Sequence, residues 1–175
     1  VPFYEGYGVR SRYVGHPLAD DLATVPRDSG DHLRRRLRID PGAQVLGVLP
    51  GSRDHEVFDL VPFYGRILRS LGSERGPRRV IVSCFREAHR TFIESQLQGC
   101  PFPYDIVSGD SRPLMLASDA LIVASGTASL EAAYFQKPMV VLYRAGTLAR
   151  ALFRVFAVTP FFALPNIVGG RLLGG

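Results

Sequence analysis

Short apolar runs alternate along this chain with stretches whose apolar residues recur at helical spacing. The runs at 45–49, 80–82, 104–107, 120–124 and 139–143 are typical of strands that are buried on both faces. Helical spacing predicts helices at 57–71, 87–97, 112–118, 127–135 and 148–157. A strand followed by a helix, repeated several times, indicates parallel βαβ units. The predicted fold class is therefore α/β, with a doubly wound parallel sheet.

The first forty residues fit this pattern less well. We expect a short strand at 12–15 and a helix at 32–37 that is capped by Asp31 and ends near Asp40. No internal repeat or low-complexity tract interrupts the chain.

Composition supports a folded, basic protein. The 175 residues are 46% apolar and 21% charged, which is enough to build a core. The net charge of +5 is almost all arginine, because Lys137 is the single lysine. Arginine binds phosphate with a planar fork of donors, so the excess suits nucleic acid, nucleotides or an anionic membrane, although a solvated charged face explains it too.

Targeting and redox features are sparse. The longest apolar stretch, 155–168, is interrupted by prolines and polar residues, so no transmembrane helix is predicted. The first residues show no signal-peptide pattern. Two cysteines without Cys-x-x-Cys spacing favour a reduced, cytoplasmic compartment.

The turn that follows the run at 45–49 reads Leu-Pro-Gly-Ser-Arg at 49–53. Ligands of open parallel sheets bind at the carboxyl ends of strands. Gly51 allows close backbone approach, Ser52 offers a hydroxyl, and Arg53 offers a forked cation. Glu56 falls in the first turn of the next helix, where a carboxylate is favoured. An anion site and a plain tight turn with a helix cap explain these residues equally well.

A second turn follows the run at 120–124 and reads Ser-Gly-Thr at 125–127. Small residues leave the helix start open, so its free N–H groups could hold a phosphate. Glu131 lies about one helical turn after Thr127 and could accept hydrogen bonds from a ribose diol. Ser and Thr are also ordinary helix caps, but two such turns at one edge of a sheet strengthen the case for a ligand site.

Other motifs argue against several protein classes. The chain has no P-loop, no Gly-x-Gly-x-x-Gly after a strand, and no Gly-x-Ser-x-Gly. Its four histidines lack metal-ligand spacing, so no metal site is predicted. His16, after an expected strand end, is a candidate ligand-facing residue, with a surface or capping role as the alternative. Basic and aromatic residues mix at 143–167, a pattern that fits either a membrane surface or a packed helix.

Five strings, in order, carry a resemblance to the lipid-A-disaccharide synthase family. They are Val-Gly-His-Pro-Leu at 14–18 with Asp20, Leu-Pro-Gly-Ser-Arg at 49–53 with Glu56, Ala-Ser-Asp at 117–119 leading to 124–131, Pro-Met-Val-Val at 138–141 with Tyr143 and Arg144, and Leu-Pro-Asn at 164–166 with Gly170 and Arg171. Any one string is weak, whereas five in order and across almost the whole chain are specific.

The resemblance implies a Rossmann-like domain of a glycosyltransferase with the GT-B architecture, namely its C-terminal, nucleotide-sugar-binding half. Such an enzyme transfers 2,3-diacylglucosamine from its UDP carrier to 2,3-diacylglucosamine 1-phosphate, with inversion, and yields lipid A disaccharide 1-phosphate and UDP. No metal or other cofactor is implied. The resemblance assigns substrate binding to residues of the two turns and a few outside them: Gly51, Ser52, Arg53, Ser125, Gly126, Thr127, Glu131, Asn166, His16 and Arg144.

The resemblance also implies a domain division. Residues 1–20 would end a preceding domain and include a first strand, and 21–175 would form the nucleotide-sugar-binding domain. The acceptor domain and its catalytic base are expected outside this chain, in a longer protein, a partner or a homodimer. The expected location is the cytoplasmic face of the bacterial inner membrane, whose anionic surface is a partner. Nucleic acid is not an expected partner. Another UDP-sugar enzyme (an epimerase or a peptidoglycan glucosaminyltransferase) and a non-catalytic UDP-sugar-binding module remain alternatives.

Overall fold

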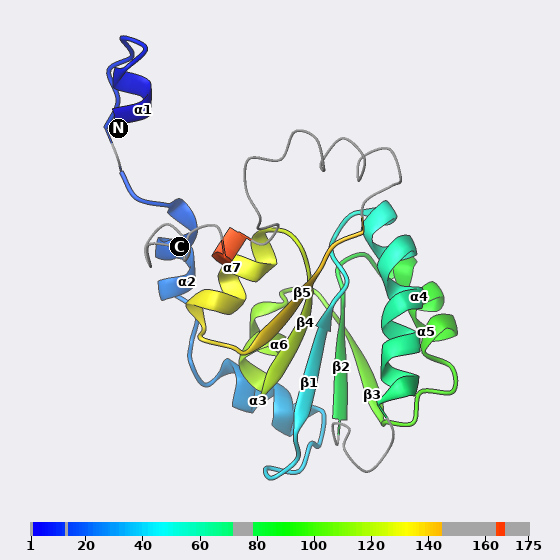
Figure 1. The fold of residues 1–175 in the computed structure, drawn as a ribbon. Helices are drawn as coiled ribbons and strands as arrows, with labels where there is room; N and C mark the ends of the chain where they lie inside the picture. Colours follow the sequence, from blue (N-terminus) through cyan, green and yellow to red (C-terminus); the bar gives the residue numbers. More distant parts are fainter. Residues whose placement is uncertain (1, 13, 72–78, 145–163, 167–175) are drawn as a thin grey trace.

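A five-stranded parallel sheet forms the centre of the computed structural model, in the strand order β3-β2-β1-β4-β5 (Figure 1). The structure describes residues 2–12, 14–71, 79–144 and 164–166. The strands are β1 (Val45–Leu49), β2 (Arg79–Cys84), β3 (Tyr104–Ser108), β4 (Ala120–Ala124) and β5 (Met139–Leu142). All five expected strands are thus present, within two residues at each end.

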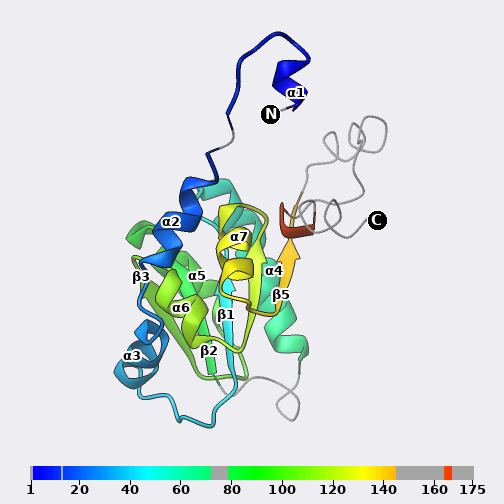
Figure 2. The ribbon, with the colours of Figure 1, turned by 90° about the vertical axis from the view of Figure 1, so that its left-hand side faces the viewer.

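Helices cover both faces of this sheet. The chain has helices α1 (Pro2–Glu5), α2 (Pro17–Ala23), α3 (Ser29–Arg36), α4 (Asp54–Ser70), α5 (Arg90–Leu97), α6 (Arg112–Ala117) and α7 (Thr127–Tyr134), with a 3-10 turn at Glu87–His89. Helices α4 and α5 pack on one face, and α2, α3, α6 and α7 lie on the other (Figures 1 and 2). The predicted doubly wound α/β class is confirmed.

Alternate residues of each strand serve the two faces. In β4, Ile122 packs with the α4 and α5 side chains, whereas Leu121 and Val123 pack with α6 and α7. In β1, Val48 and Leu49 likewise point to opposite cores. Because helices cover both faces, the inner strands β1, β2 and β4 have no solvent-facing side that would need polar residues, which explains their apolar runs.

The N-terminal region differs from the expectations. Arg12, Val14 and Gly15 are in irregular backbone, so the expected strand is wrong for these residues. No strand of the described sheet lies beside them, and Pro17 instead starts α2. Helix α2 crosses residue 20, the expected domain boundary, and buries Leu22 on the α7 side of the sheet. Helix α1 stands away from the sheet in both ribbon views (Figures 1 and 2).

The observed helix starts differ from the expected ones by more residues than the helix ends do. Helix α3 begins at Ser29 after Asp28, so Asp31 lies inside its first turn and the expected cap is wrong. Gly30 lets α3 approach the α6 backbone so closely that a side chain at this position would collide with Leu116. The helix expected at 148–157 lies outside the described residues. Within the described residues, no helix is long and apolar enough to cross a lipid bilayer.

Candidate functional site

The two turns singled out in the sequence meet at the carboxyl edge of the sheet. Strands β1 and β4 are neighbours, and Leu49 pairs with Val123. The strand order reverses between β1 and β4, which is where open α/β sheets bind ligands. A cavity of about 180 Å³ opens between the turns. Residues from both turns and the helices that follow them, from the end of β2 and from the segment before α6 line it: Leu49, Gly51, Ser52, Arg53, Glu56, Ser83, Phe85, Ser111, Ala124, Ser125, Gly126, Thr127 and Ala128.

The turn after β1 is held in shape by Glu56. Its Oε2 accepts hydrogen bonds from the backbone N–H groups of Ser52 (3.0 Å) and Arg53 (3.2 Å). Gly51 has φ +103°, a conformation that favours glycine, and a Cβ there would collide with the Glu56 carboxylate. Glu56 therefore braces the turn from its own helix.

Arg53 is the exposed cation of this turn. It stands at the N-cap of α4, its side chain is 72% exposed, and its Nη1 lies 3.2 Å from Glu56 Oε1. One ion pair uses only part of a guanidinium that has five N–H donors. The remaining donors and the net positive charge can therefore serve an anion in the cavity.

The turn after β4 presents the start of α7. Gly126 is its N-cap residue, and the Ser129 hydroxyl donates to the Gly126 carbonyl oxygen (2.7 Å). The first N–H groups of a helix have no acceptor within that helix, and they carry the positive end of its dipole. Thr127 and Ala128, both in this first turn, line the cavity. Arg53 and the N-terminus of α7 thus line the same cavity.

Glu131 lies one turn further along α7, behind the lining residues. Its side chain is 15% exposed, and its Oε2 is 3.8 Å from the Arg112 Nε. Burial raises the pKa of Glu131 above its ordinary value, and the Arg112 guanidinium opposes this rise. Arg112 directly follows Ser111, a lining residue, so this pair stands beside the cavity.

Besides Glu131, three residues of the predicted site do not line this cavity in the described structure. His16 caps α2, because its Nδ1 accepts the Leu18 N–H at 3.2 Å. Arg144 donates to the Asp59 carbonyl oxygen at 3.1 Å and lies 3.4 Å from the carboxylate of the same residue. Asn166 is exposed in the short described segment 164–166. The other seven predicted residues are the six that line the cavity and Glu131 beside it.

The structure adds three lining residues that sequence reasoning missed: Ser83, Phe85 and Ser111. Ser83 and Phe85 stand at the end of β2, and Ser111 just precedes α6. The sequence could have indicated Ser83 and Phe85, because β2 is parallel to β1 and ends at the same edge of the sheet. These two residues, however, form no recognisable motif. Phe85 is 61% exposed and gives the cavity an aromatic wall.

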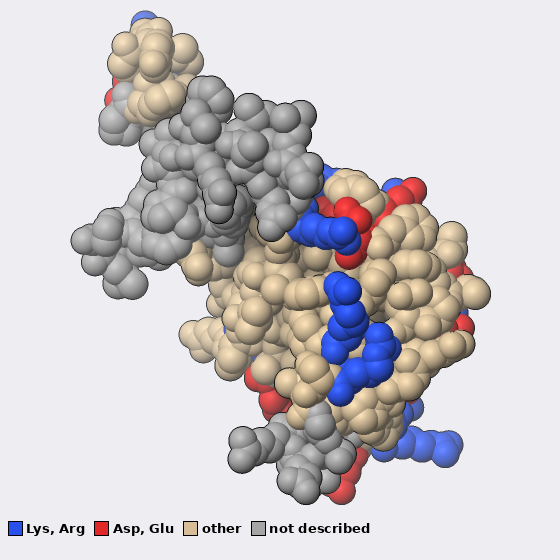
Figure 3. Space-filling model, turned by 45° about the vertical axis from the view of Figure 1, so that its right-hand side comes forward, with Lys and Arg blue, Asp and Glu red and all other residues tan. Residues whose placement is uncertain are grey.

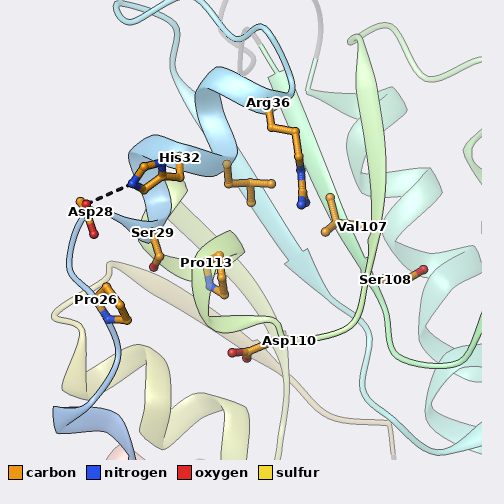
Figure 4. Close-up of a pocket in the computed structure, with 10 residues that line it drawn as sticks. Pro26, Asp28, Ser29, His32, Arg36, Val107, Ser108, Asp110 and Pro113 are labelled. Atoms are coloured by element: carbon orange, nitrogen blue, oxygen red, sulfur yellow. Dashed lines mark hydrogen bonds and ion pairs between the residues drawn. The ribbon is translucent and has the colours of Figure 1, made fainter.

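A larger hollow of about 840 Å³ lies elsewhere, between α3, the end of β3 and the start of α6 (Figure 4). Its walls include Asp28 and His32, whose side chains are 3.1 Å apart. None of the predicted site residues lines it. Among the residues that the structure describes, no group of three or more His, Cys, Asp or Glu side chains is arranged to hold a metal ion.

Comparison with known proteins assigns this chain to a family. Residues 1–174 match the family described as lipid-A-disaccharide synthetase. The chain belongs to this family.

Curated lipid-A-disaccharide synthases from several bacteria are similar to the chain. One from Pseudomonas aeruginosa (strain LESB58) is 40% identical over 98% of this chain and 45% of its own length. Those from Azotobacter vinelandii and Hahella chejuensis are 38% and 36% identical, again over 98% of this chain, and over 45% and 43% of their own lengths. The chain therefore spans less than half the length of these lipid-A-disaccharide synthases.

A solved structure of a glycosyltransferase from Rickettsia africae ESF-5 is also similar to this chain. Its TM-score is 0.49 and its sequence identity 14%, over 74% of this chain and 36% of that one.

Proposed function

We propose that this chain is the donor-binding half of a lipid-A-disaccharide synthase with the GT-B architecture, and that the edge cavity binds UDP-2,3-diacylglucosamine. The carrying observation is that Arg53 and the N-terminus of α7 line one cavity at the point where the strand order reverses. Family membership and relatives of this name support the same assignment.

The reaction that we propose is an inverting transfer of 2,3-diacylglucosamine to 2,3-diacylglucosamine 1-phosphate, which releases UDP. The bond from the sugar to the diphosphate breaks as the acceptor hydroxyl attacks, so negative charge grows on the departing diphosphate. Arg53 and the N–H groups at the start of α7 would stabilise this charge without reorganising. In this role the turns act on the leaving group, and Glu131 would accept hydrogen bonds from the ribose.

The acceptor site and the catalytic base belong, in this proposal, to the part of the relatives that this chain does not match. That part would come from a longer chain, a partner or a second copy.

Both substrates carry acyl chains, so the proposed location is the cytoplasmic face of the inner membrane, next to its anionic lipids. Figure 3 shows basic side chains in separate small groups on the side covered by α4, with much uncharged surface between them. Membrane contact through this face would therefore depend on several weak contacts rather than on one basic patch.

A calorimetric titration with UDP tests the nucleotide site. We expect UDP to bind, and Arg53→Ala to weaken binding by about 1–3 kcal/mol, the usual loss for a charge-assisted contact. The matched control is Arg66→Ala, which removes an exposed arginine from the same helix, where it stacks on Phe63 and does not line the cavity.

Three outcomes distinguish the alternatives. No UDP binding by the unmodified chain would contradict the proposed function. Equal losses for Arg53→Ala and Arg66→Ala would indicate a general charge effect and would remove Arg53 from the site. UDP binding by a chain that gives no transfer, even when joined to the remaining length of a relative, would favour a non-catalytic binding module.

A further inference from the structure

A buried histidine and an aspartate form a pair beside the edge cavity. His89 Nε2 lies 3.0 Å from Asp54 Oδ1, and Arg86 Nη1 lies 2.9 Å from the same oxygen. Asp54 is the first residue of α4, and the other two residues belong to the loop after β2. One carboxylate oxygen thus joins the segments that follow two neighbouring strands.

The His89 ring lies in a buried position against an aromatic side chain, where an apolar residue would also pack well. It is 5% exposed, and the Phe58 ring meets it edge-on at 5.7 Å between centroids. Its Nδ1 is buried and has no hydrogen-bond partner among the described residues. An unpaired buried nitrogen costs stability, so packing alone does not account for a histidine at this position.

The neighbours of the joined residues line the cavity. Arg53 precedes Asp54 on one side, and Phe85 precedes Arg86 on the other. The contacts to Asp54 therefore set the spacing between the cationic turn and the aromatic wall. The Arg86 and Asp54 side chains are 55% and 59% exposed, so their ion pair alone would hold Asp54 only weakly. His89 is 5% exposed, so its position is fixed by packing.

We propose that His89, with Arg86, is a positioning residue that holds Asp54 so that Arg53 faces the bound diphosphate. The ligand in this inference, a nucleoside diphosphate, rests on the proposed function. The contact of His89 with Asp54 does not depend on the proposed function, because it should order the turn at 51–54 before any ligand binds. His89 transfers no proton in this role.

Two substitutions of His89 separate positioning from packing. His89→Phe keeps an aromatic ring but removes the donor to Asp54, and we expect UDP affinity to fall by about 5- to 20-fold. The side-chain nitrogen of Gln can take the place of Nε2, so His89→Gln should restore affinity to within about twofold. Thermal unfolding of each variant shows whether it is folded at the titration temperature.

The matched control is His32→Phe. The His32 Nε2 lies 3.1 Å from Asp28 Oδ2, which makes an exposed His–Asp pair of similar length away from the edge cavity (Figure 4). UDP affinity should be unchanged in this variant. Arg86→Met, at an exposed position that should tolerate the change, is expected to weaken UDP binding by about 2- to 5-fold.

Hydrogen exchange in the unliganded chain gives a second measurement. The Ser52 and Arg53 N–H groups donate hydrogen bonds to Glu56. His89→Phe should speed the exchange of these two amides, and His89→Gln should not. Unchanged exchange and affinity in His89→Phe, or equal effects of Phe and Gln, would overturn the inference. If the unmodified chain does not bind UDP, the proposed function fails, and exchange alone decides whether the contact of His89 with Asp54 orders the turn.

Discussion

Two glutamates that the sequence places at the same edge have different environments in the structure. Glu56 accepts two backbone N–H groups and holds the turn that carries Arg53. Glu131 is partly buried beside Arg112, and desolvation raises its pKa above the ordinary value. Residue type and spacing predict a carboxylate near the ligand edge in both cases. Only the contacts show that Glu56 stabilises the turn, whereas the surroundings of Glu131 disfavour its charged form.

Replacing Glu131 should move stability and affinity in opposite directions. A carboxyl group with a raised folded-state pKa binds its proton more tightly in the fold, so its ionisation destabilises the fold as pH rises above the ordinary value of 4.5. We therefore expect Glu131→Gln to raise Tm at pH 7 by about 1–4 °C, and the gain to disappear at low pH. Loss of the charged acceptor should weaken UDP binding by about 3- to 10-fold.

Thermal unfolding between pH 4 and pH 8, with UDP titrations at pH 7, measures both effects. A lower Tm for Glu131→Gln at pH 7 would show that the Arg112 contact outweighs the cost of burial. Unchanged UDP affinity would remove Glu131 from the proposed ribose contact.

At the scale of elements, strands were easier to predict than helix starts. A buried strand is identified by its own apolar run, and β1 and β4 have the predicted limits. A helix start depends on neighbours. Helix α3 begins three residues early because Gly30 packs against α6, and α4 begins at Asp54 because Glu56 accepts the N–H of its N-cap residue, Arg53. The contact of α3 with α6 joins segments far apart in the sequence, which the local pattern does not show, whereas the Glu56 contact lies within three residues.

Close packing between α4 and α5 gives a test at this scale. Gly65 is buried in α4, and a Cβ there would collide with the Gln96 carbonyl oxygen of α5. Alanine normally favours helix by about 0.5–1 kcal/mol over glycine. We nevertheless expect Gly65→Ala to destabilise the chain by about 1–3 kcal/mol, because the helices must move apart.

Thermal or urea unfolding measures this loss, and Gly126→Ala is the control. A Cβ at Gly126 meets nothing within 4 Å, and its φ of 174° suits any residue, so Tm should not change. An increase in stability for Gly65→Ala would mean that α4 and α5 are less closely packed than described.

At the scale of the whole molecule, strand order decides whether a site exists. The chain forms β1, β2 and β3 in sequence across one half of the sheet, then returns to place β4 on the other side of β1. That return brings together two turns about seventy residues apart in the sequence. With another order the same turns would lie at the same edge but on separated strands, and no shared cavity would form.

The sheet should also be unequally stable across its width. Ile81 and Val123 are fully buried, whereas Val140 of the edge strand β5 is 59% exposed. We expect amides of β1, β2 and β4 to exchange hydrogen about 10-fold or more slowly than those of β5, because local opening of an edge costs less than global unfolding. Exchange followed by NMR measures this, and equal protection of all five strands would contradict it.

The sequence by itself determined the fold class, the five strands, and the two turns whose residues suit an anion, because these depend on local apolar pattern, turn chemistry and spacing. Tertiary structure decided which residues share the cavity. It gathered Phe85 and Ser111, left His16 at a helix cap, and joined His89 to Asp54. Such contacts follow from strand order and from helix packing, which bring together residues that are far apart in the sequence. The local sequence pattern does not show which distant residues will become neighbours.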